Sequence, residues 1–287
     1  MRYLFIISAL LLITHNTWAQ APKTDVSLFM RSDSTKYLSE VSEKTGDLYK
    51  TIGHHGPAVE NQWLALRMYF DHKAAIDVYN KAKPGLELKQ ARWYPTPEQQ
   101  KDGWGADYYK VGSTVGLGGI RLWDGEKVIK LDPVSMRTAR VKRETNSAYM
   151  EMLSEGVNYK DTQVDILVRV TVYSNCREAK VEAFSLSDIP VQFVTGVNYH
   201  SNHWQQIGVG YIAAWGLHPE DVAAETISLG AAIIYNPKDF LDRIDDGKQH
   251  LLISKPTKML QTRITSACER EIEINTFEKF VEYLEKL

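Results

Sequence analysis

The feature that most constrains the fold of this chain is a series of short runs rich in β-branched and aromatic residues. Turn signals such as Asp124-Gly125 and Asp246-Gly247 punctuate these runs, as is typical of antiparallel strands. Residues 164–172 alternate apolar and polar side chains, which predicts a strand with one buried face. The sequence therefore predicts an all-β, antiparallel fold. The expected strands span residues 63–71, 162–174, 178–186, 191–199, 208–215, 229–235 and 259–267.

One helix is predicted at the C-terminus. Asn275 offers a capping side chain and Glu278 follows three positions later, which is the pattern of a capping box. Residues 33–49 are a second candidate helix. Four apolar residues at helical spacing give the C-terminal helix one face for docking on a sheet: Phe277, Phe280, Val281 and Leu284.

The rest of the chain offers no boundary between domains. No linker rich in serine or glycine interrupts it and no internal repeat is found, so we expect one β-rich domain over residues 22–287. Residues 83–102 contain three prolines and predict a long loop. Loops of this length are uncommon unless they build or cover a functional site.

The first nineteen residues have the parts of a secretory signal peptide. Arg2 supplies a positive charge, an apolar run follows over residues 4–13, and Ala19 is a small residue at a plausible cleavage point. The apolar run is too short for a membrane span, which needs about 20 residues. We expect residues 1–19 to be removed and the protein to be periplasmic or secreted.

Charge and cysteine content narrow the partners. The chain has 34 Lys and Arg against 36 Asp and Glu, which argues against nucleic acid as the main partner, because phosphate binding needs a basic excess. Cys176 and Cys268 are the only cysteines. An oxidising compartment would permit a disulfide between them, and two separate buried thiols are the alternative.

Residues 53–71 hold the first candidate site. Four apolar residues share one strand face, which predicts core: Leu64, Leu66, Met68 and Phe70. The opposite face is polar and aromatic together, which suits a sugar-binding surface, and a solvated face with one Arg–Asp pair is the alternative. The loop before the strand adds three titratable groups, which favours a site. The candidate residues are His54, His55, Glu60, Asn61, Trp63, Arg67 and Tyr69.

A second cluster lies at the end of the run 191–199. Asn198 and His200 share one strand face, and the loop beyond adds His203 and Trp204. The His-x-x-His spacing would allow a metal if a carboxylate such as Glu60 completed the ligands. Acid–base roles fit these histidines better, because the pKa of an unperturbed imidazole lies near neutral pH. We therefore expect no cofactor and keep a metal as the alternative.

Two neighbouring segments complete the candidates. Residues 102–110 form an aromatic and charged loop, in which Trp104, Tyr108 and Lys110 are expected beside the site; a surface loop pinned by its tryptophan is the alternative. Residues 112–119 hold four glycines, but neither their spacing nor a βαβ context fits a nucleotide site. We interpret these glycines as positions of close backbone approach. No Gly-x-Ser-x-Gly elbow is present, which disfavours an acyl-transfer hydrolase.

Five segments together resemble a family of exported proteins, known as a domain of unknown function, from polysaccharide-degradation loci of Bacteroidetes. They are residues 54–61, 67–71, 75–79, 109–112 and 116–119. The resemblance implies a galactose-mutarotase-like β-sandwich, or supersandwich, whose concave sheet carries the site. It also implies an oligosaccharide dehydratase acting on ulvan-type uronic acids, which leaves a 4,5-unsaturated sugar at the non-reducing end.

The residue types suit this β-elimination. The reaction removes the C5 proton of a glucuronate or iduronate and expels the C4 hydroxyl, so the uronate carboxylate must be neutralised. We expect Arg67 to do so with help from Lys110. His200 or Tyr69 is the expected base and His55 the expected acid. The predicted partner is therefore an anionic oligosaccharide.

Two other classes of function stay open. A non-catalytic sugar-binding protein would use Trp63, Trp104 and Trp204 as platforms, and an aldose-epimerase-like enzyme would use a histidine and a carboxylate. The number of histidines favours an enzyme. In the dehydratase scheme, Glu60 is expected to orient the imidazole of His55.

Overall fold

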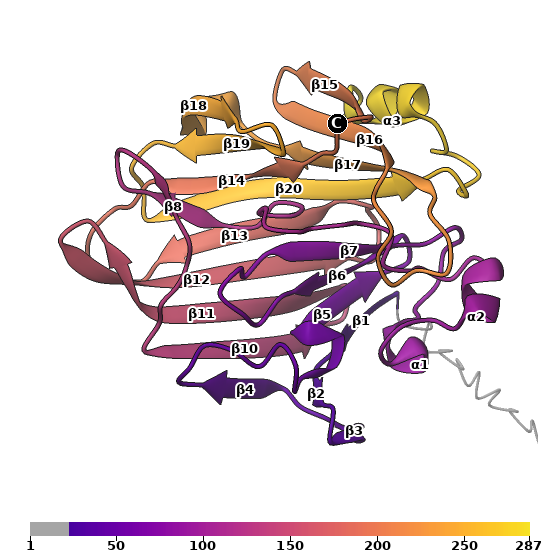
Figure 1. Cartoon of the computed structure of the whole chain (residues 1–287), viewed down its shortest axis with the longest axis horizontal. Helices are drawn as coiled ribbons and strands as arrows, with labels where there is room; N and C mark the ends of the chain where they lie inside the picture. The colour runs from indigo at the N-terminus through magenta and orange to yellow at the C-terminus, as the bar shows by residue number, and fades with distance from the viewer. Residues whose placement is uncertain (1–22) are drawn as a thin grey trace, which may run out of the picture.

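The structure is a computed structural model that describes residues 23–287, so the expected signal peptide, residues 1–19, lies outside the described residues. A nine-stranded antiparallel sheet forms one layer of the molecule (Figure 1). In spatial order its strands are β15 (Trp204–Gly208), β16 (Tyr211–Leu217), β17 (Ser228–Ile234), β20 (Met259–Cys268), β13 (Ala179–Ser185), β12 (Thr162–Tyr173), β11 (Ser147–Tyr159), β10 (Met136–Arg143) and β4 (Glu40–Glu43).

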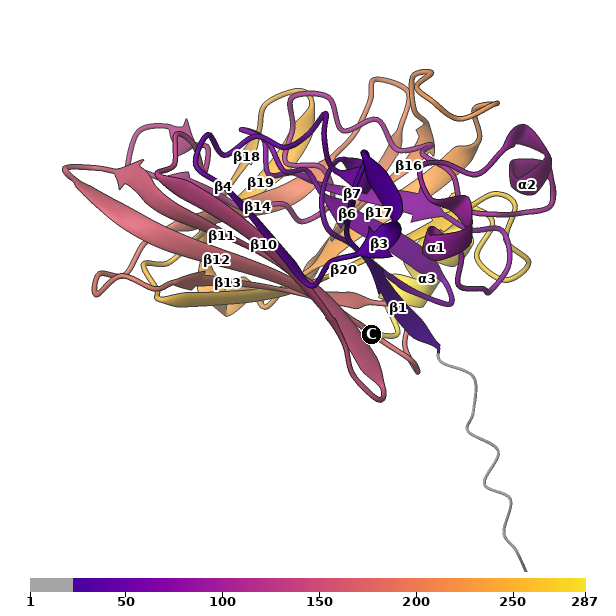
Figure 2. The ribbon, with the colours of Figure 1, turned by 90° about the horizontal axis from the view of Figure 1, so that it is seen from below.

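Two smaller antiparallel sheets form the second layer (Figure 2). Strand β5 contacts β11 and β12, β6 and β7 contact β20, and β14 contacts β16 and β17, so the smaller sheets pack on the large one. The first contains β1 (Thr24–Ser27), β5 (Ala58–Asn61), β6 (Leu64–Met68) and β7 (Ile76–Asn80). The second contains β18 (Phe240–Asp245), β19 (Gln249–Ser254), β14 (Phe193–Asn198), β8 (Arg121–Trp123) and β9 (Val128–Ile129). Strands β2 (Phe29–Met30) and β3 (Asp33–Tyr37) pair separately.

Helices are few and short. They are α1 (Leu88–Ala91), α2 (Pro97–Lys101), α3 (Phe277–Leu284) and the 3₁₀ turns η1 (Gly53–His55) and η2 (Pro237–Asp239). The predicted antiparallel β-sandwich with a C-terminal helix is confirmed. The predicted cap of that helix is wrong by one residue, because the Thr276 hydroxyl, rather than Asn275, accepts the backbone N–H of Lys279. No helix within residues 23–287 is long and apolar enough to cross a membrane.

The main core lies between the layers. Leu64, Leu66, Met68 and Phe70 are all buried in it, as the alternation of this segment predicts. The glycine segment also behaves as predicted: a Cβ on Gly116 would lie 2.0 Å from the carbonyl oxygen of Ile76, and one on Gly119 would lie 2.1 Å from that of Val115. Only glycine permits such close backbone approach.

The structure corrects the helix expected over residues 33–49 and distinguishes between the two alternatives for the cysteines. The candidate helix over residues 33–49 is wrong, because β3 and β4 occupy it and β4 pairs with β10 at the sheet edge. Leu38, Val41 and Leu48 recur at helical spacing, but they pack against the core without forming a helix, so pairing with β10 outweighs the local pattern. Cys176 is half-buried and Cys268 buried, and both are free thiols, which is the alternative to the disulfide.

Candidate functional site

Arg67 lies at the centre of a buried polar cluster. The β6–β7 register places Arg67 opposite Asp77, and the side chain of Arg67 is 1% exposed. Its Nε and Nη2 donate to Asp77 Oδ2 at 2.9 and 2.6 Å, and Nη2 also donates to Asp107 Oδ2 at 2.5 Å. Asp107 comes from the segment that follows α2, so this segment closes over the strand face.

Three tyrosines surround the same guanidinium. Arg67 donates to the hydroxyl oxygens of Tyr79 at 2.6 Å and of Tyr69 and Tyr94 at 3.1 Å. Tyr69 in turn donates to Asp77 Oδ2 at 2.6 Å. Tyr69 and Tyr79 are buried, whereas Tyr94 is half-buried and is the member that reaches the surface. We call this set the arginine hub: Arg67, Asp77, Asp107, Tyr69, Tyr79 and Tyr94.

The hub contains one cation and two carboxylates, so it has an excess negative charge that burial makes costly. Burial raises the pKa of Asp107 to about 8, against the opposing attraction of Arg67. Asp107 Oδ1 is buried and has no hydrogen-bond partner among the described residues. At neutral pH a proton on Asp107 therefore neutralises the hub.

His55 joins the hub at the surface. The imidazole is half-buried, stacks on Tyr49 at 4.0 Å between ring centroids, and has Nδ1 2.7 Å from the carbonyl oxygen of Tyr49. Because a carbonyl can only accept, Nδ1 carries the proton and Nε2 has the free electron pair. Nε2 lies 3.2 Å from the Tyr94 hydroxyl, which donates to it. Burial lowers the pKa of His55, so the ring is a neutral base.

The backbone of the histidine turn is strained. His54 and His55 both have left-handed φ angles, 54° and 59°, and a Cβ on Gly56 would lie 1.8 Å from the carbonyl oxygen of Met68. Non-glycine residues in this region cost roughly 1–2 kcal/mol each, and such strain is concentrated at functional sites. The contacts of the His55 ring with Tyr49 and Tyr94 hold this backbone in its unfavourable conformation.

His54, predicted to bind substrate, is a structural residue instead. It is 1% exposed, and its Nε2 lies 3.0 Å from the Ser27 hydroxyl. Burial lowers the pKa of His54 to about 3. Of the two adjacent histidines, His54 is buried and only His55 reaches the surface.

Glu60 and Asn61 also have structural roles that the sequence did not reveal. Glu60 accepts hydrogen bonds from Lys81 Nζ at 2.6 Å and from the backbone N–H groups of Glu87 and Leu88. It therefore anchors the loop over residues 83–102, which we call the covering loop, and does not orient His55. Asn61 Oδ1 accepts the backbone N–H of Trp63 at 2.9 Å and forms the β5–β6 turn. Both side chains are buried away from any surface.

Two catalytic roles predicted from the sequence are wrong. Arg67 cannot meet a substrate carboxylate, because it is buried and its nitrogens are bound within the hub. Tyr69 cannot be the base, because burial, with Asp77 beside it, raises the pKa of its hydroxyl far above the ordinary value. The alternation of β6 gave the correct face, but the loop over residues 83–102 buries it.

A second group of side chains, which we call the histidine cluster, consists of His200, His203 and His218. Their ring centroids lie 4.6–5.2 Å apart. The Lys110 backbone N–H donates to His218 Nδ1 at 3.0 Å, so this nitrogen is unprotonated and His200 Nε2, 3.1 Å away, donates to it. Burial lowers the pKa of all three rings, to about 4 for His203. The cluster is therefore neutral at neutral pH.

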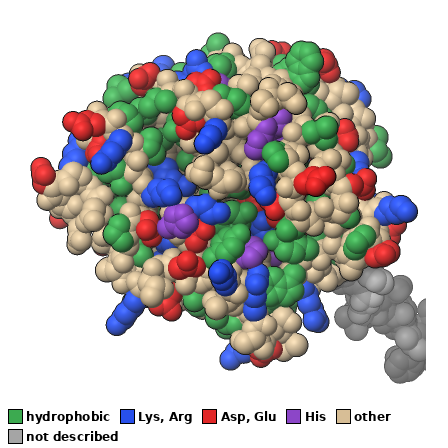
Figure 3. All heavy atoms as spheres, viewed as in Figure 1, with side chains coloured by type: hydrophobic (Ala, Val, Ile, Leu, Met, Phe, Trp, Pro, Cys, Tyr) green, Lys and Arg blue, Asp and Glu red, His purple; other side chains and the backbone are tan. Residues whose placement is uncertain are grey.

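Tyr109 lies between the arginine hub and the histidine cluster. Its ring lies 4.6 Å from that of His218, and burial together with the negative charge of Asp77 raises the pKa of its hydroxyl. Lys110 does not assist Arg67, because its Nζ pairs with Asp221 at 3.0 Å. Figure 3 shows histidine side chains at separate places on this face, with lysine and arginine side chains among them.

The remaining predicted residues are dispersed. Asn198 belongs with the histidine cluster, since its amide donates to the carbonyl oxygen of Lys110 at 2.7 Å. Tyr108 lies 3.4 Å from Arg270 Nη1, which donates to its hydroxyl. Trp204 is 68% exposed and stacks on Phe277 of α3. The other two predicted tryptophans, Trp63 and Trp104, are half-buried and belong to neither the hub nor the histidine cluster.

Comparison with known proteins identifies the family. The model of a domain of unknown function, DUF4861, matches residues 14–287. The chain belongs to this family. A search of curated proteins finds no match.

Several solved structures resemble this DUF4861 chain. A putative aldose 1-epimerase from Klebsiella pneumoniae has 8% identity and a TM-score of 0.42, with 92% of this chain and 94% of that chain covered. A 4-alpha-glucanotransferase from Thermococcus litoralis has 10% identity and a TM-score of 0.35, with 74% and 37% covered. A glycosyl hydrolase family 38 protein from Enterococcus faecalis has 8% identity and a TM-score of 0.40, with 93% and 41% covered. These values carry no function over to the DUF4861 chain.

Several site residues of the DUF4861 chain were not predicted from the sequence. Asp77 and Tyr79 alternate along β7 opposite β6, so the pairing of the two strands could have revealed them. Tyr94, Asp107 and His218 come from irregular segments that carry no periodic signal. Within residues 23–287 no three His, Cys, Asp or Glu side chains are placed to hold a metal ion.

Proposed function

We propose that this DUF4861 chain is an exported dehydratase that carries out β-elimination at the non-reducing-end uronic acid of anionic oligosaccharides such as ulvan fragments. The resemblance of its sequence motifs to proteins of Bacteroidetes polysaccharide loci supports the substrate class. The observation that carries the proposal is the contact between His55 and Tyr94 over the buried hub.

His55 and Tyr94 supply the two proton transfers. The unprotonated Nε2 of His55 takes the C5 proton, and the electrons of the C5–H bond form the C4=C5 double bond. The C4–O bond breaks, and its oxygen leaves as water with the proton of the Tyr94 hydroxyl. The proton transfer leaves a phenolate on Tyr94. Arg67 Nη1 lies 3.1 Å from the Tyr94 oxygen and stabilises this phenolate. The proton on His55 then returns to Tyr94, which restores both groups.

Two accessible cations flank the pair and would neutralise the uronate carboxylate. Arg31 is exposed, lies 3.7 Å over the Trp93 ring, and has Nη2 3.3 Å from His55 Nδ1. Lys73 is half-buried, its Nζ lies 5.5 Å from the Tyr49 ring, which stacks on His55, and it also pairs with Asp71 at 3.8 Å. A cleft of about 460 Å³ adjoins Tyr49 on the side of His72, and a neighbouring part of the oligosaccharide would lie there. These cations replace Arg67 in the role that the sequence gave it.

The experiment is alkene formation from saturated ulvan oligosaccharides, followed by the ultraviolet absorbance of the conjugated double bond. The wild-type protein should give a rise, and His55→Ala should abolish it. His200→Ala is the matched control, because His200 is half-buried like His55 and lies outside the hub. Sugar binding without any rise would support a non-catalytic binding protein, and a change in optical rotation without a rise would support an aldose-epimerase-like enzyme.

A further inference from the structure

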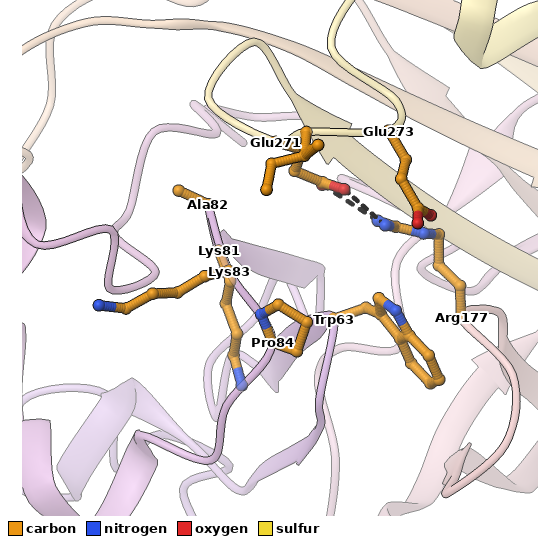
Figure 4. A pocket seen from close by; sticks show the side chains of 9 residues that line it. Trp63, Lys81, Ala82, Lys83, Pro84, Arg177, Glu271 and Glu273 are labelled. Atoms are coloured by element: carbon orange, nitrogen blue, oxygen red, sulfur yellow. Dashed lines mark hydrogen bonds and ion pairs between the residues drawn. The ribbon is translucent and has the colours of Figure 1, made fainter.

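A second pocket lies at the end of β6, away from the hub. It has a volume of about 240 Å³ and lies between the β5–β6 turn, the start of the covering loop and the segment after β20. Trp63 precedes Arg67 by four residues, which is about 13 Å along a strand. Figure 4 shows Trp63 and Pro84 on one side and Glu271 with Arg177 on the other.

The polar wall of this pocket is rigid. Arg177 Nη1 and Nη2 donate to the two oxygens of Glu271 at 3.0 and 2.5 Å, and Nη1 also donates to the carbonyl oxygen of Ser266 at 2.9 Å. The Arg177 and Glu271 side chains are only 8% and 9% exposed. The two planar groups therefore present fixed donors and acceptors at their edges, which suits a pair of neighbouring hydroxyl groups.

The opposite wall is apolar. The Trp63 ring is half-buried, so one part of it packs on the protein and another part lines the pocket. Ile272 lies at the rim and is 88% exposed, so it adds apolar surface that a ligand can reach. An aromatic ring facing fixed polar groups matches a ligand that has a flat C–H face and hydroxyl edges.

The charges of the pocket cancel. Lys81, Lys83 and Arg177 line it together with Glu271 and Glu273, and Glu60 pairs with Lys81 from behind at 2.6 Å. Three cations thus face three carboxylates, and no excess charge favours an anion. The surroundings of His55 differ, because Arg31 and Lys73 flank that site.

We infer that this pocket binds a neutral pyranose ring of a saccharide, with its C–H face on Trp63 and its hydroxyls on the Arg177–Glu271 pair. The inference rests on the proposed function for its choice of polymer. The pocket would hold an uncharged sugar of the chain whose uronate end reacts at His55, or of a neighbouring chain, and would thereby raise the affinity for longer substrates.

The test is the affinity for a saturated ulvan tetrasaccharide, measured by titration calorimetry in the Tyr94→Phe background so that no turnover occurs. Trp63→Ala should weaken binding about tenfold, which corresponds to about 1.4 kcal/mol and is the upper end of the range for an aromatic contact. Ile272→Asp should do the same without disturbing the core, because Ile272 is exposed. Trp204→Ala, which removes an exposed tryptophan elsewhere, should leave the affinity unchanged.

The outcomes separate the two proposals. Unchanged affinity in both Trp63→Ala and Ile272→Asp overturns the inference, and so does a parent protein that does not bind the tetrasaccharide. Binding that depends on Trp63, found with a wild-type protein that forms no alkene, supports the pocket and contradicts the dehydratase.

Discussion

The arginine hub and the histidine cluster are both built from titratable side chains, yet burial shifts their pKa values in opposite directions. In the hub, Arg67 pairs with the buried Asp77, and burial raises the pKa of Asp107 to about 8. In the cluster, three imidazoles contact one another, and burial lowers their pKa values. The hub therefore keeps a fixed cation beside an accessible His–Tyr pair, whereas the cluster is an uncharged group.

This difference shows which features make a group of polar residues suitable for acid–base chemistry. A neutral base next to a phenol requires a nearby positive charge to stabilise the phenolate, and Arg67 supplies it for Tyr94. No Lys or Arg side chain donates a hydrogen bond to the three imidazoles within the described chain, and Lys110 contacts them through its backbone only. We therefore place the reaction at the hub.

Removal of Arg67 should have the largest effect. Arg67→Leu leaves Asp77 buried without its cation, which should lower the free energy of unfolding by about 3–5 kcal/mol and abolish activity. The matched change, Lys110→Leu, breaks a half-exposed pair and should cost less than about 1 kcal/mol. Urea unfolding of both variants measures the two losses. Equal losses of unfolding free energy would show that Asp77 does not need the charge of Arg67 to be buried.

The activities of two histidine variants should differ next. His55→Ala should lower the rate of alkene formation about 10²–10⁴-fold, the range for loss of a general acid or base. His200→Ala should change it less than tenfold, as expected of a residue outside the reacting groups. The comparison uses initial rates at saturating substrate. A larger loss in His200→Ala would move the reaction to the histidine cluster, where the sequence placed one of its two candidate bases.

The pH dependence of stability should have opposite signs in the two regions. Between pH 3.8 and about 8, folded Asp107 is protonated while its unfolded form is ionised, so its contribution to stability is lost as the pH rises. Between pH 6.5 and about 4, folded His203 is neutral while its unfolded form is protonated, so its contribution is lost as the pH falls.

Thermal unfolding across this pH range separates the two effects. Asp107→Asn should flatten the alkaline side of the profile and His203→Gln the acid side. A profile that both variants leave unchanged would contradict the burial argument for each group.

The smallest effect is expected at the edge strand. Trp204 is 68% exposed and contacts Phe277, so Trp204→Ala should lower the free energy of unfolding by about 0.5–1.5 kcal/mol and leave alkene formation unchanged. Urea unfolding and the absorbance assay measure both. A loss of activity would mean that substrate reaches β15.

The sequence predicted the strands well where their own residues carry the signal. β12 and β20 lie within one or two residues of their expected bounds, because each alternates against the same core. Strand β11, at 13 residues one of the longest, was missed although its register with β12 is regular apart from one bulge. Its polar residues, such as Glu151 paired with Arg169, obscure the apolar alternation.

The site was predictable only in part. The sequence named His55, Arg67 and Tyr69 as neighbours, because they lie on one strand and the turn before it. It could not show that the loop over residues 83–102 buries the guanidinium, or that this loop supplies Tyr94 and the segment after α2 supplies Asp107, since long-range packing leaves no local pattern. This loop is the reason that we propose Arg31 and Lys73, and not Arg67, for the neutralising role.

The central claim is that Tyr94, held between Arg67 and His55, transfers the proton in an elimination reaction. The most direct test is the initial rate of alkene absorbance with a saturated, uronate-terminated ulvan oligosaccharide, measured for the wild-type protein and for Tyr94→Phe. Phenylalanine keeps the ring and removes only the hydroxyl. We predict a steady rise for the wild type and a rate about 10² or more times lower for the variant; equal rates, or no rise with the wild-type protein, would contradict the account.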